Sequence, residues 1–194
     1  MTDVVWRPEH DPSIRPPLEE GAVYRPDILQ VIDNAIDGLR GDLRKLSLDI
    51  HDHPELRFEE KYAHEAYTAF MESQGFVVTK HYILPTAWVA TYTHGQGGRV
   101  LGVNSEMDAL PGIGHACGHN LIGISGVAVA CAAKAAMEQF GIDGKVILLG
   151  TPAEEGGFGK VRLFEKGAYE EMDMCLMWAI SCPGIKYIRK TLRN

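Results

Sequence analysis

Segments with the patterns of helices and strands alternate along this chain, and this alternation constrains the fold more than any other feature. An alanine-rich apolar segment, Leu121 to Phe140, has the length of a helix and lies between two β-rich runs. These runs are Arg99 to Val103 and Lys145 to Gly150, and the second is apolar enough for a buried strand. Such alternation is typical of α/β folds, and this class is predicted.

Helical periodicity also appears earlier in the sequence. Apolar residues recur at intervals of three and four from Asp27 to Ile50, which predicts one long amphipathic helix that Pro54 ends. A second helix is expected over about 59–74, closed by Gly75, and Asn120 is expected to cap the alanine-rich helix. The other expected elements are strands at 76–84, 87–93 and 172–180, the first two lying beside 99–103, and a helix at 159–168.

The N-terminal segment differs from the rest of the chain. Residues 1–26 carry five prolines and little periodicity, so an extended Pro-rich arm is expected there. Residues 27–194 are expected to form one folded unit, because 45% hydrophobic and 23% charged residues are the usage of ordinary soluble domains.

Composition and charge exclude several classes of partner and location. The net charge is −7, from 19 Lys and Arg against 26 Asp and Glu, which argues against a nucleic-acid partner. The longest uncharged apolar stretch, Leu121–Ala133, is too short to span a bilayer, so no membrane association is expected. The polar N-terminus lacks a signal-peptide pattern, and four cysteines without framework spacing fit a reducing compartment. A cytoplasmic protein is therefore expected.

Three segments concentrate metal-binding and acid–base side chains where strands are expected to end. They are Ser105–Pro111, His115–Asn120 and Gly150–Gly157. In open α/β sheets, ligands bind outside the carboxyl ends of the strands, so these segments predict a functional site.

The second of these segments contains a His-x-Cys-x-His pattern formed by His115, Cys117 and His119. In an extended loop, alternate side chains point the same way and offer two imidazoles and a thiolate to one cation, a set that zinc accepts. The alternative is structural, with Cys117 as a small buried residue and the histidines as capping or surface groups. Spacing alone does not decide between the two.

The third segment contains the adjacent carboxylates Glu154 and Glu155, followed by two glycines. One carboxylate can bind a cation while the other accepts a proton from water and passes it to a leaving amine. The alternative is a pair of solvated acids at a helix start. A phosphate-binding loop is excluded because Glu154 stands where its first glycine is required, and no serine-hydrolase elbow is present.

Together these segments resemble peptidase family M20, in particular its branch of N-acyl amino acid amidohydrolases and β-alanyl-lysine dipeptidase-like proteins. The resemblance rests on several motifs in order and runs from about Ile28 to Met177. The matching segments are 51–56, 86–90, 105–111, 112–120, 150–155 and 166–169.

The resemblance implies a three-layer αβα catalytic lobe and metal-dependent hydrolysis of amide bonds in dipeptides or N-acyl amino acids. It implies metal ligands at Cys117, His119 and Glu155 and a general base at Glu154. It also implies that Asp108 orients a ligand histidine, while His115 lies beside the ligands or on the substrate side. The implied cofactor is zinc, as one or two cations, with manganese or cobalt as alternatives.

The chain departs from the family pattern in its histidines. The family's lid or dimerisation domain, and a C-terminal portion with a last histidine ligand, are expected to be absent from residues 27–194. Another ligand histidine is expected after Met177, but no histidine follows His119, and Cys182 is the available substitute. Three protein ligands suffice for one zinc but not for the family's pair of metals.

These departures leave two main hypotheses. In the first, the chain is a metallohydrolase. In the second, it is a catalytically inactive remnant that binds a peptide or a full-length partner through an exposed sheet edge. A purely structural zinc at Cys117, His119 and Glu155 is a third hypothesis, and assembly with further copies of the chain is left open.

Overall fold

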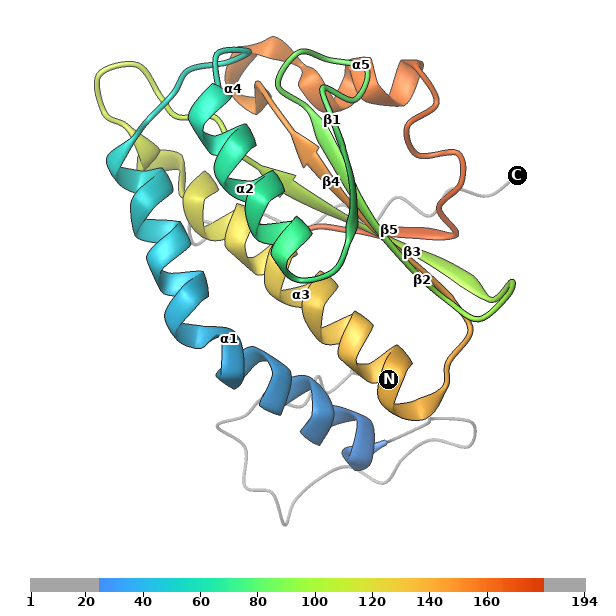
Figure 1. Cartoon of the computed structure of the whole chain (residues 1–194). Coiled ribbons are helices and arrows are strands. Elements are labelled where there is room, and N and C mark those ends of the chain that lie inside the picture. The colour runs from blue at the N-terminus through green and yellow to red at the C-terminus, as the bar shows by residue number, and fades with distance from the viewer. Residues whose placement is uncertain (1–24, 180–194) are drawn as a thin grey trace, which may run out of the picture.

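The computed structural model describes residues 25–179, which form a five-stranded mixed sheet covered by helices (Figure 1). The strand order is β1-β2-β4-β3-β5. The strands are β1 (Val77–Lys80), β2 (Trp88–His94), β3 (Arg99–Glu106), β4 (Gly144–Thr151) and β5 (Met174–Leu176). Strand β4 pairs antiparallel with β2 and parallel with β3, which also pairs parallel with β5.

The helices cover the two faces of this sheet unequally. One face packs against α1 (Pro26–Asp52), α2 (Lys61–Ser73) and α3 (His119–Phe140), and the other packs against α5 (Gly159–Glu165). Successive residues of a strand point to opposite faces, so Leu148 joins the larger core and Leu149 the smaller one. The predicted α/β class and three-layer αβα architecture are confirmed.

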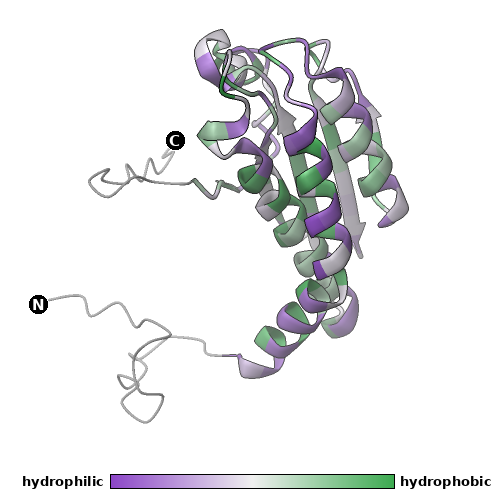
Figure 2. Cartoon of the chain, turned by 90° about the vertical axis from the view of Figure 1, so that its left-hand side faces the viewer, coloured by the Kyte–Doolittle hydropathy of each residue, from purple (hydrophilic) through white to green (hydrophobic). Residues whose placement is uncertain are grey.

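The long N-terminal helix has the two-sided character that its sequence predicts. Hydrophilic and hydrophobic residues alternate along α1 (Figure 2). Its buried side chains Leu43, Leu46 and Ile50 belong to the larger core, while most of its remaining residues are partly or fully exposed. Burial of this apolar stripe against α3 attaches α1 to the layer of helices that covers the sheet.

Helix α3 lies close against β3 because two of its residues have no side chain. A Cβ atom at Gly123 would lie 2.8 Å from the carbonyl oxygen of Glu106, and one at Gly126 would lie 2.8 Å from that of Asn104. Both distances are shorter than normal contacts, so glycine is required for this approach. Helix α3 is long and apolar enough to cross a membrane by length and composition alone, but over half of its most apolar 18-residue window is buried against the rest of the fold.

The predicted helices and strands are present, but the sheet order differs from the expectation. Strand β3 is not beside β2, because β4 lies between them and pairs with both. All but one residue of β4 are buried, and the most apolar strand gains most from a central position with neighbours on both sides.

The expected cap of α3 is also wrong. Helix α3 starts at His119, its N-cap position is Gly118, and no side chain makes a capping hydrogen bond. Asn120 lies inside the helix, where its side-chain nitrogen donates to the hydroxyl of Ser47 at 3.2 Å and so joins α3 to α1.

The ends of the described region limit two further predictions. The last strand covers only Met174–Leu176 of the expected 172–180, and Ile180 lies outside the described residues. The same holds for Cys182 and for residues 1–24 of the expected N-terminal arm, whereas Pro26 already belongs to α1.

Candidate metal centre

The candidate site lies where the parallel strands β3 and β4 end side by side. Their last residues, Glu106 and Thr151, are direct register partners. The loops that follow the two strands therefore start side by side at the carboxyl end of the sheet. One loop carries Asp108 and the other carries the Glu154–Glu155 pair. This is the position at which open α/β sheets bind ligands.

The His-x-Cys-x-His segment is wound and not extended. Residues His115–Cys117 form a short 3₁₀ turn, η2, which passes through Gly118 into α3. Gly118 has a φ of 81°, in the left-handed region that glycine adopts without strain. The expected extended loop is therefore wrong, and of its three side chains only those of Cys117 and His119 offer donor atoms to a common group.

The third potential metal ligand, Glu155, comes from the loop after β4. Single donor atoms of Cys117, His119 and Glu155 all lie within 4.8 Å of one another. His119 is buried, whereas Cys117 and Glu155 are partly exposed. A thiol, an imidazole and a carboxylate converging in this way fit one zinc-like divalent cation, with a fourth position left for water or substrate.

Asp108 contacts both the ligand histidine and the turn that carries the two glutamates. One of its carboxylate oxygens lies 3.1 Å from Nδ1 of His119 and accepts the backbone N–H of Glu154 at 3.0 Å. Its other oxygen accepts the backbone N–H of Glu155 at 2.8 Å. One carboxylate therefore fixes both the histidine ring and the turn that carries the two glutamates.

The contacts of Nδ1 determine which way the His119 ring faces. Nδ1 also lies 2.7 Å from the backbone carbonyl of Asp108, so Nδ1 carries the proton when the ring is neutral. The other nitrogen, Nε2, then faces three carboxylates, with an oxygen of Glu106 at 3.2 Å and an oxygen of Glu154 and of Glu155 at 3.9 Å each. This orientation is the one that a ligand histidine needs.

His115 lies outside the donor set. Its side chain is buried, and neither ring nitrogen has a hydrogen-bond partner in the described part of the chain. Its ring centroid is 6.4 Å from that of His51 at the end of α1. His115 is therefore not one of the three donors, although burial and then the nearby charges of His119 and His51 lower its pKa.

Three charged residues join the site although no role was predicted for them from the sequence. Glu106 is buried, pairs with Lys160 and lies 3.2 Å from Nε2 of His119. Glu60 is also buried and accepts the backbone N–H of Ala153, the residue before Glu154, at 2.8 Å. The sequence gives no local signal for these contacts, because their partners lie far along the chain.

Burial and nearby charges shift the pKa values of Asp108, His119 and Cys117. Burial alone would raise the pKa of Asp108, but hydrogen bonds from His119 and from the backbone of Glu155 and Glu154 outweigh it and lower that pKa. Burial alone would lower the pKa of His119, but Asp108 and Glu106 raise it overall. Burial raises the pKa of the Cys117 thiol, so a bound cation would be needed to hold it as a thiolate.

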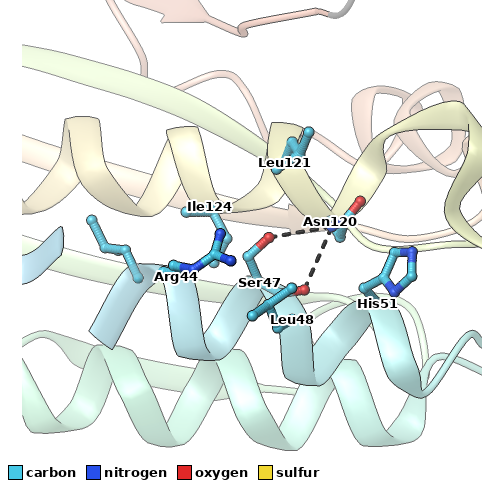
Figure 3. Close-up of a pocket in the computed structure, with 8 residues that line it drawn as sticks. Arg44, Ser47, Leu48, His51, Asn120, Leu121 and Ile124 are labelled. Carbon is cyan, nitrogen blue, oxygen red and sulfur yellow. Dashed lines mark hydrogen bonds between the residues drawn. The ribbon is translucent and has the colours of Figure 1, made fainter. Parts of the chain in front are cut away.

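A groove of about 310 Å³ runs between α1 and α3 beside the site (Figure 3). Figure 3 shows Asn120 bridging the groove to Ser47, with His51 at one end and Arg44 further along α1. None of the three donor residues lines it. The groove is therefore adjacent to the metal centre and separate from it.

Comparison with known proteins identifies the family. The profile of peptidase family M20/M25/M40 matches residues 102–190. One component of the p-aminobenzoyl-glutamate hydrolase of Escherichia coli (strain K12) is 36% identical over 186 residues, which are 87% of this chain and 38% of that protein. The Xaa-Arg dipeptidase of Homo sapiens is 39% identical over 180 residues, 83% of this chain and 41% of the dipeptidase. The chain belongs to this M20 peptidase family.

This M20 chain spans about two fifths of the length of the relatives that it matches. A solved structure with the same fold is that of the Bacillus subtilis YXEP protein, described as a dinuclear metal binding peptidase from the M20 family. The two are 24% identical, with a TM-score of 0.62 over 72% of this chain and 42% of YXEP. The aligned region thus has the fold of the M20 peptidases.

Proposed function

We propose that this chain provides the metal centre and general base of a hydrolase that cleaves amide bonds in dipeptides or N-acyl amino acids. The observation that carries the proposal is the convergence of donor atoms from Cys117, His119 and Glu155 at the shared carboxyl edge of β3 and β4. The Xaa-Arg dipeptidase and p-aminobenzoyl-glutamate hydrolase relatives support this substrate class, since both names describe hydrolysis next to an amino acid.

The three donors divide the task of holding a divalent cation, for which we propose zinc. The imidazole Nε2 of His119, the thiolate of Cys117 and one oxygen of Glu155 would be the ligands. Thiolate and imidazole favour zinc over harder cations, and the described residues supply enough ligands for one cation. A cation at this position would supply Lewis acidity, by polarising the scissile carbonyl and making water easier to deprotonate.

Glu154 is proposed as the general base. Its carboxylate is partly exposed and lies 3.9 Å from Nε2 of His119, next to the donors and open to a substrate. A carboxylate in this position can accept a proton from the attacking water and return it to the leaving amine. Its backbone N–H is held by Asp108, which keeps the base at a constant position relative to the ligands.

The test separates the two glutamates. In the full chain we expect Glu155→Gln to bind about one equivalent of zinc fewer than the wild type, measured by elemental mass spectrometry after dialysis, and Glu154→Gln to bind as much as the wild type. With N-acyl amino acids and dipeptides as substrates, Glu154→Gln should lose about 10²–10⁴-fold in rate, the usual contribution of a general base. Equal zinc loss in both variants, or no loss in either, would contradict the assigned roles. A zinc-loaded wild type without turnover would reject catalysis by this chain.

A second candidate function is binding without catalysis, and the exposed edge of the sheet favours it. Among residues 25–179, β5 is an edge strand, and apolar side chains along it and after it are 40–56% exposed. They are Met174, Leu176, Met177 and Trp178. An edge of this kind can pair with an extended segment of another chain. Sedimentation tests this candidate, since a stable monomer at high concentration would count against self-assembly through this edge.

A further inference from the structure

A second group of potential metal ligands lies away from the M20 centre and shares no residue with it. Donor atoms of His64, Glu65 and His81 lie within 4.8 Å of one another. His64 and Glu65 belong to α2, and His81 follows β1 directly. The family motifs include none of the three.

The two histidine rings stack on each other, and binding of one cation by both requires the exposed ring of His81 to turn out of this stack. Their centroids are 4.6 Å apart and their planes are inclined by only 12°. His81 has a φ of 55°, an unusual backbone conformation for a residue with a side chain, and its ring covers that of His64.

Both rings are held in the tautomer that suits a metal ligand. Nδ1 of His64 lies 2.9 Å from the backbone carbonyl of Thr86, and Nδ1 of His81 lies 2.6 Å from that of Pro85. A carbonyl only accepts hydrogen bonds, so each Nδ1 carries a proton and each Nε2 presents a lone pair when the ring is neutral. Histidines that bind metals usually donate their other ring N–H to a carbonyl or carboxylate in this way.

The buried member of the pair has an unused ligand atom. His64 is 1% exposed, and its Nε2 has no hydrogen-bond partner among residues 25–179. A buried polar atom without a partner costs free energy, so it indicates a missing group such as an ion or a water molecule. A carboxylate oxygen of Glu65 lies 4.0 Å from this atom.

The third ligand is available despite its ion pair. Lys80 contacts Oε2 of Glu65 at 2.6 Å, while the oxygen that faces His64 is Oε1. Coordination through Oε1 therefore leaves the Lys80 pair intact. Two imidazoles and one carboxylate are a ligand set that zinc uses, with a fourth position left for water.

We propose that His64, Glu65 and His81 form a second site for a zinc-like divalent cation. A cation there joins α2 to the loop after β1, and this loop carries Thr86, whose hydroxyl donates to the buried Glu60. The site therefore stabilises the packing of this loop on α2, and it does not depend on the proposed hydrolase activity.

The test uses the full chain with its M20 centre disabled by Cys117→Ser and Glu155→Gln. We expect this variant to retain about one equivalent of zinc by elemental mass spectrometry and to melt at a higher temperature with zinc than with chelator. Addition of His81→Ala should weaken zinc binding at least about tenfold. Loss of a residue that only supports a ligand already costs about 10–100-fold in metal affinity, and loss of the ligand itself should cost no less. Addition of His94→Ala, a histidine outside both groups, should leave zinc binding unchanged.

Two results would overturn the proposal. One is the absence of zinc from the chain with the disabled centre, and the other is equal zinc affinity with and without His81→Ala. Because His81 is exposed and its side chain makes one hydrogen bond within residues 25–179, to Pro85, its replacement should leave the chain folded, which circular dichroism checks. Copper(II) gives a second readout, since it should broaden the imidazole NMR signals of His64 and His81 before those of His94.

Discussion

The carboxylate of Glu60 accepts the backbone N–H of Ala153 across 93 positions of the chain. Ala153 has a φ of 56°, in the left-handed region, and directly precedes the Glu154–Glu155 pair. The other oxygen of Glu60 accepts the hydroxyl of Thr86 at 2.6 Å. One buried side chain at the start of α2 thus holds the backbone from which the proposed base and one proposed metal ligand project.

Replacement of Glu60 should therefore destabilise the fold. In Glu60→Gln, an amide N–H₂ replaces one acceptor oxygen and faces either Thr86 or Ala153, which leaves a buried donor without a partner. We expect a loss of about 1–3 kcal/mol in the free energy of unfolding, measured by urea denaturation. An unchanged midpoint would show that the Glu60 contacts contribute nothing to stability.

The loss of unfolding free energy in Glu60→Gln should depend on pH. Burial raises the pKa of Glu60, so the folded chain binds this proton more tightly than the unfolded chain does. Its contribution to stability is full below the unfolded pKa and declines as pH rises through the raised folded pKa. The stability difference between wild type and Glu60→Gln should therefore decrease from acidic toward neutral pH, and an increase over this window would contradict the assignment.

Asp108 should control metal affinity without being a ligand. In Asp108→Asn, the side chain keeps one acceptor oxygen for three donors, namely His119 Nδ1 and the backbone N–H groups of Glu154 and Glu155. We expect zinc affinity to fall by about 10–100-fold, measured by competition with a chelating dye.

Asp173→Asn is the matched control for this experiment. Asp173 also accepts a backbone N–H, that of Val100 at 2.8 Å, but it lies at the β3–β5 edge and not at the metal centre. Its zinc affinity should equal that of the wild type. Similar losses in both variants would indicate a general effect of removing a carboxylate that accepts a backbone hydrogen bond.

Replacement of glycine by alanine should destabilise the fold at Gly123, in the closely packed helix α3, and not at Gly41, in α1. A Cβ at Gly123 would lie 2.2 Å from the hydroxyl of Tyr67, so Gly123→Ala should cost about 1–3 kcal/mol of unfolding free energy by overpacking. At Gly41 no heavy atom of a neighbouring element in the described part of the chain lies within 4 Å of an added Cβ, and Gly41→Ala should raise stability by about 0.5–1 kcal/mol through helix propensity. Guanidinium denaturation measures both, and similar shifts would argue against the described contact.

Cys131 should react slowly in the folded chain. Burial raises the pKa of its thiol to about 11, so only about one thiol in a thousand is ionised at pH 8. Iodoacetamide labelling followed by peptide mass spectrometry should leave Cys131 unmodified while the native chain persists. In denaturant all four cysteines should react, and equal labelling of Cys131 in both conditions would contradict its burial.

Much of this fold follows from local sequence patterns. The apolar periodicity of α1 and the short apolar run of β4 predict those elements within a few residues, because each pattern reports which face of the element is buried. The sheet order did not follow in the same way. The position of β4 between β2 and β3 depends on which strands bury most apolar surface after the chain has folded back on itself.

The site was predictable in its parts and not in its arrangement. Cys117, His119 and Glu155 do converge, but His115 does not join them, because the expected extended loop is a 3₁₀ turn. Glu106 and Lys160 pair across 54 positions, a distance over which no local motif carries information. The catalytic roles, the identity of the metal and the cytoplasmic location stay predictions.

The register between β3 and β4 makes the geometry of the site depend on the number of residues in each of the two strands. Glu106 and Thr151 are opposite each other because every preceding pair along the two strands is also in register. A one-residue insertion or deletion in either strand would shift its end by roughly 3.3 Å and reverse the direction of the following side chains. Related sequences should therefore keep the number of residues in each strand, and from each strand to its loop, unchanged even where their side chains differ.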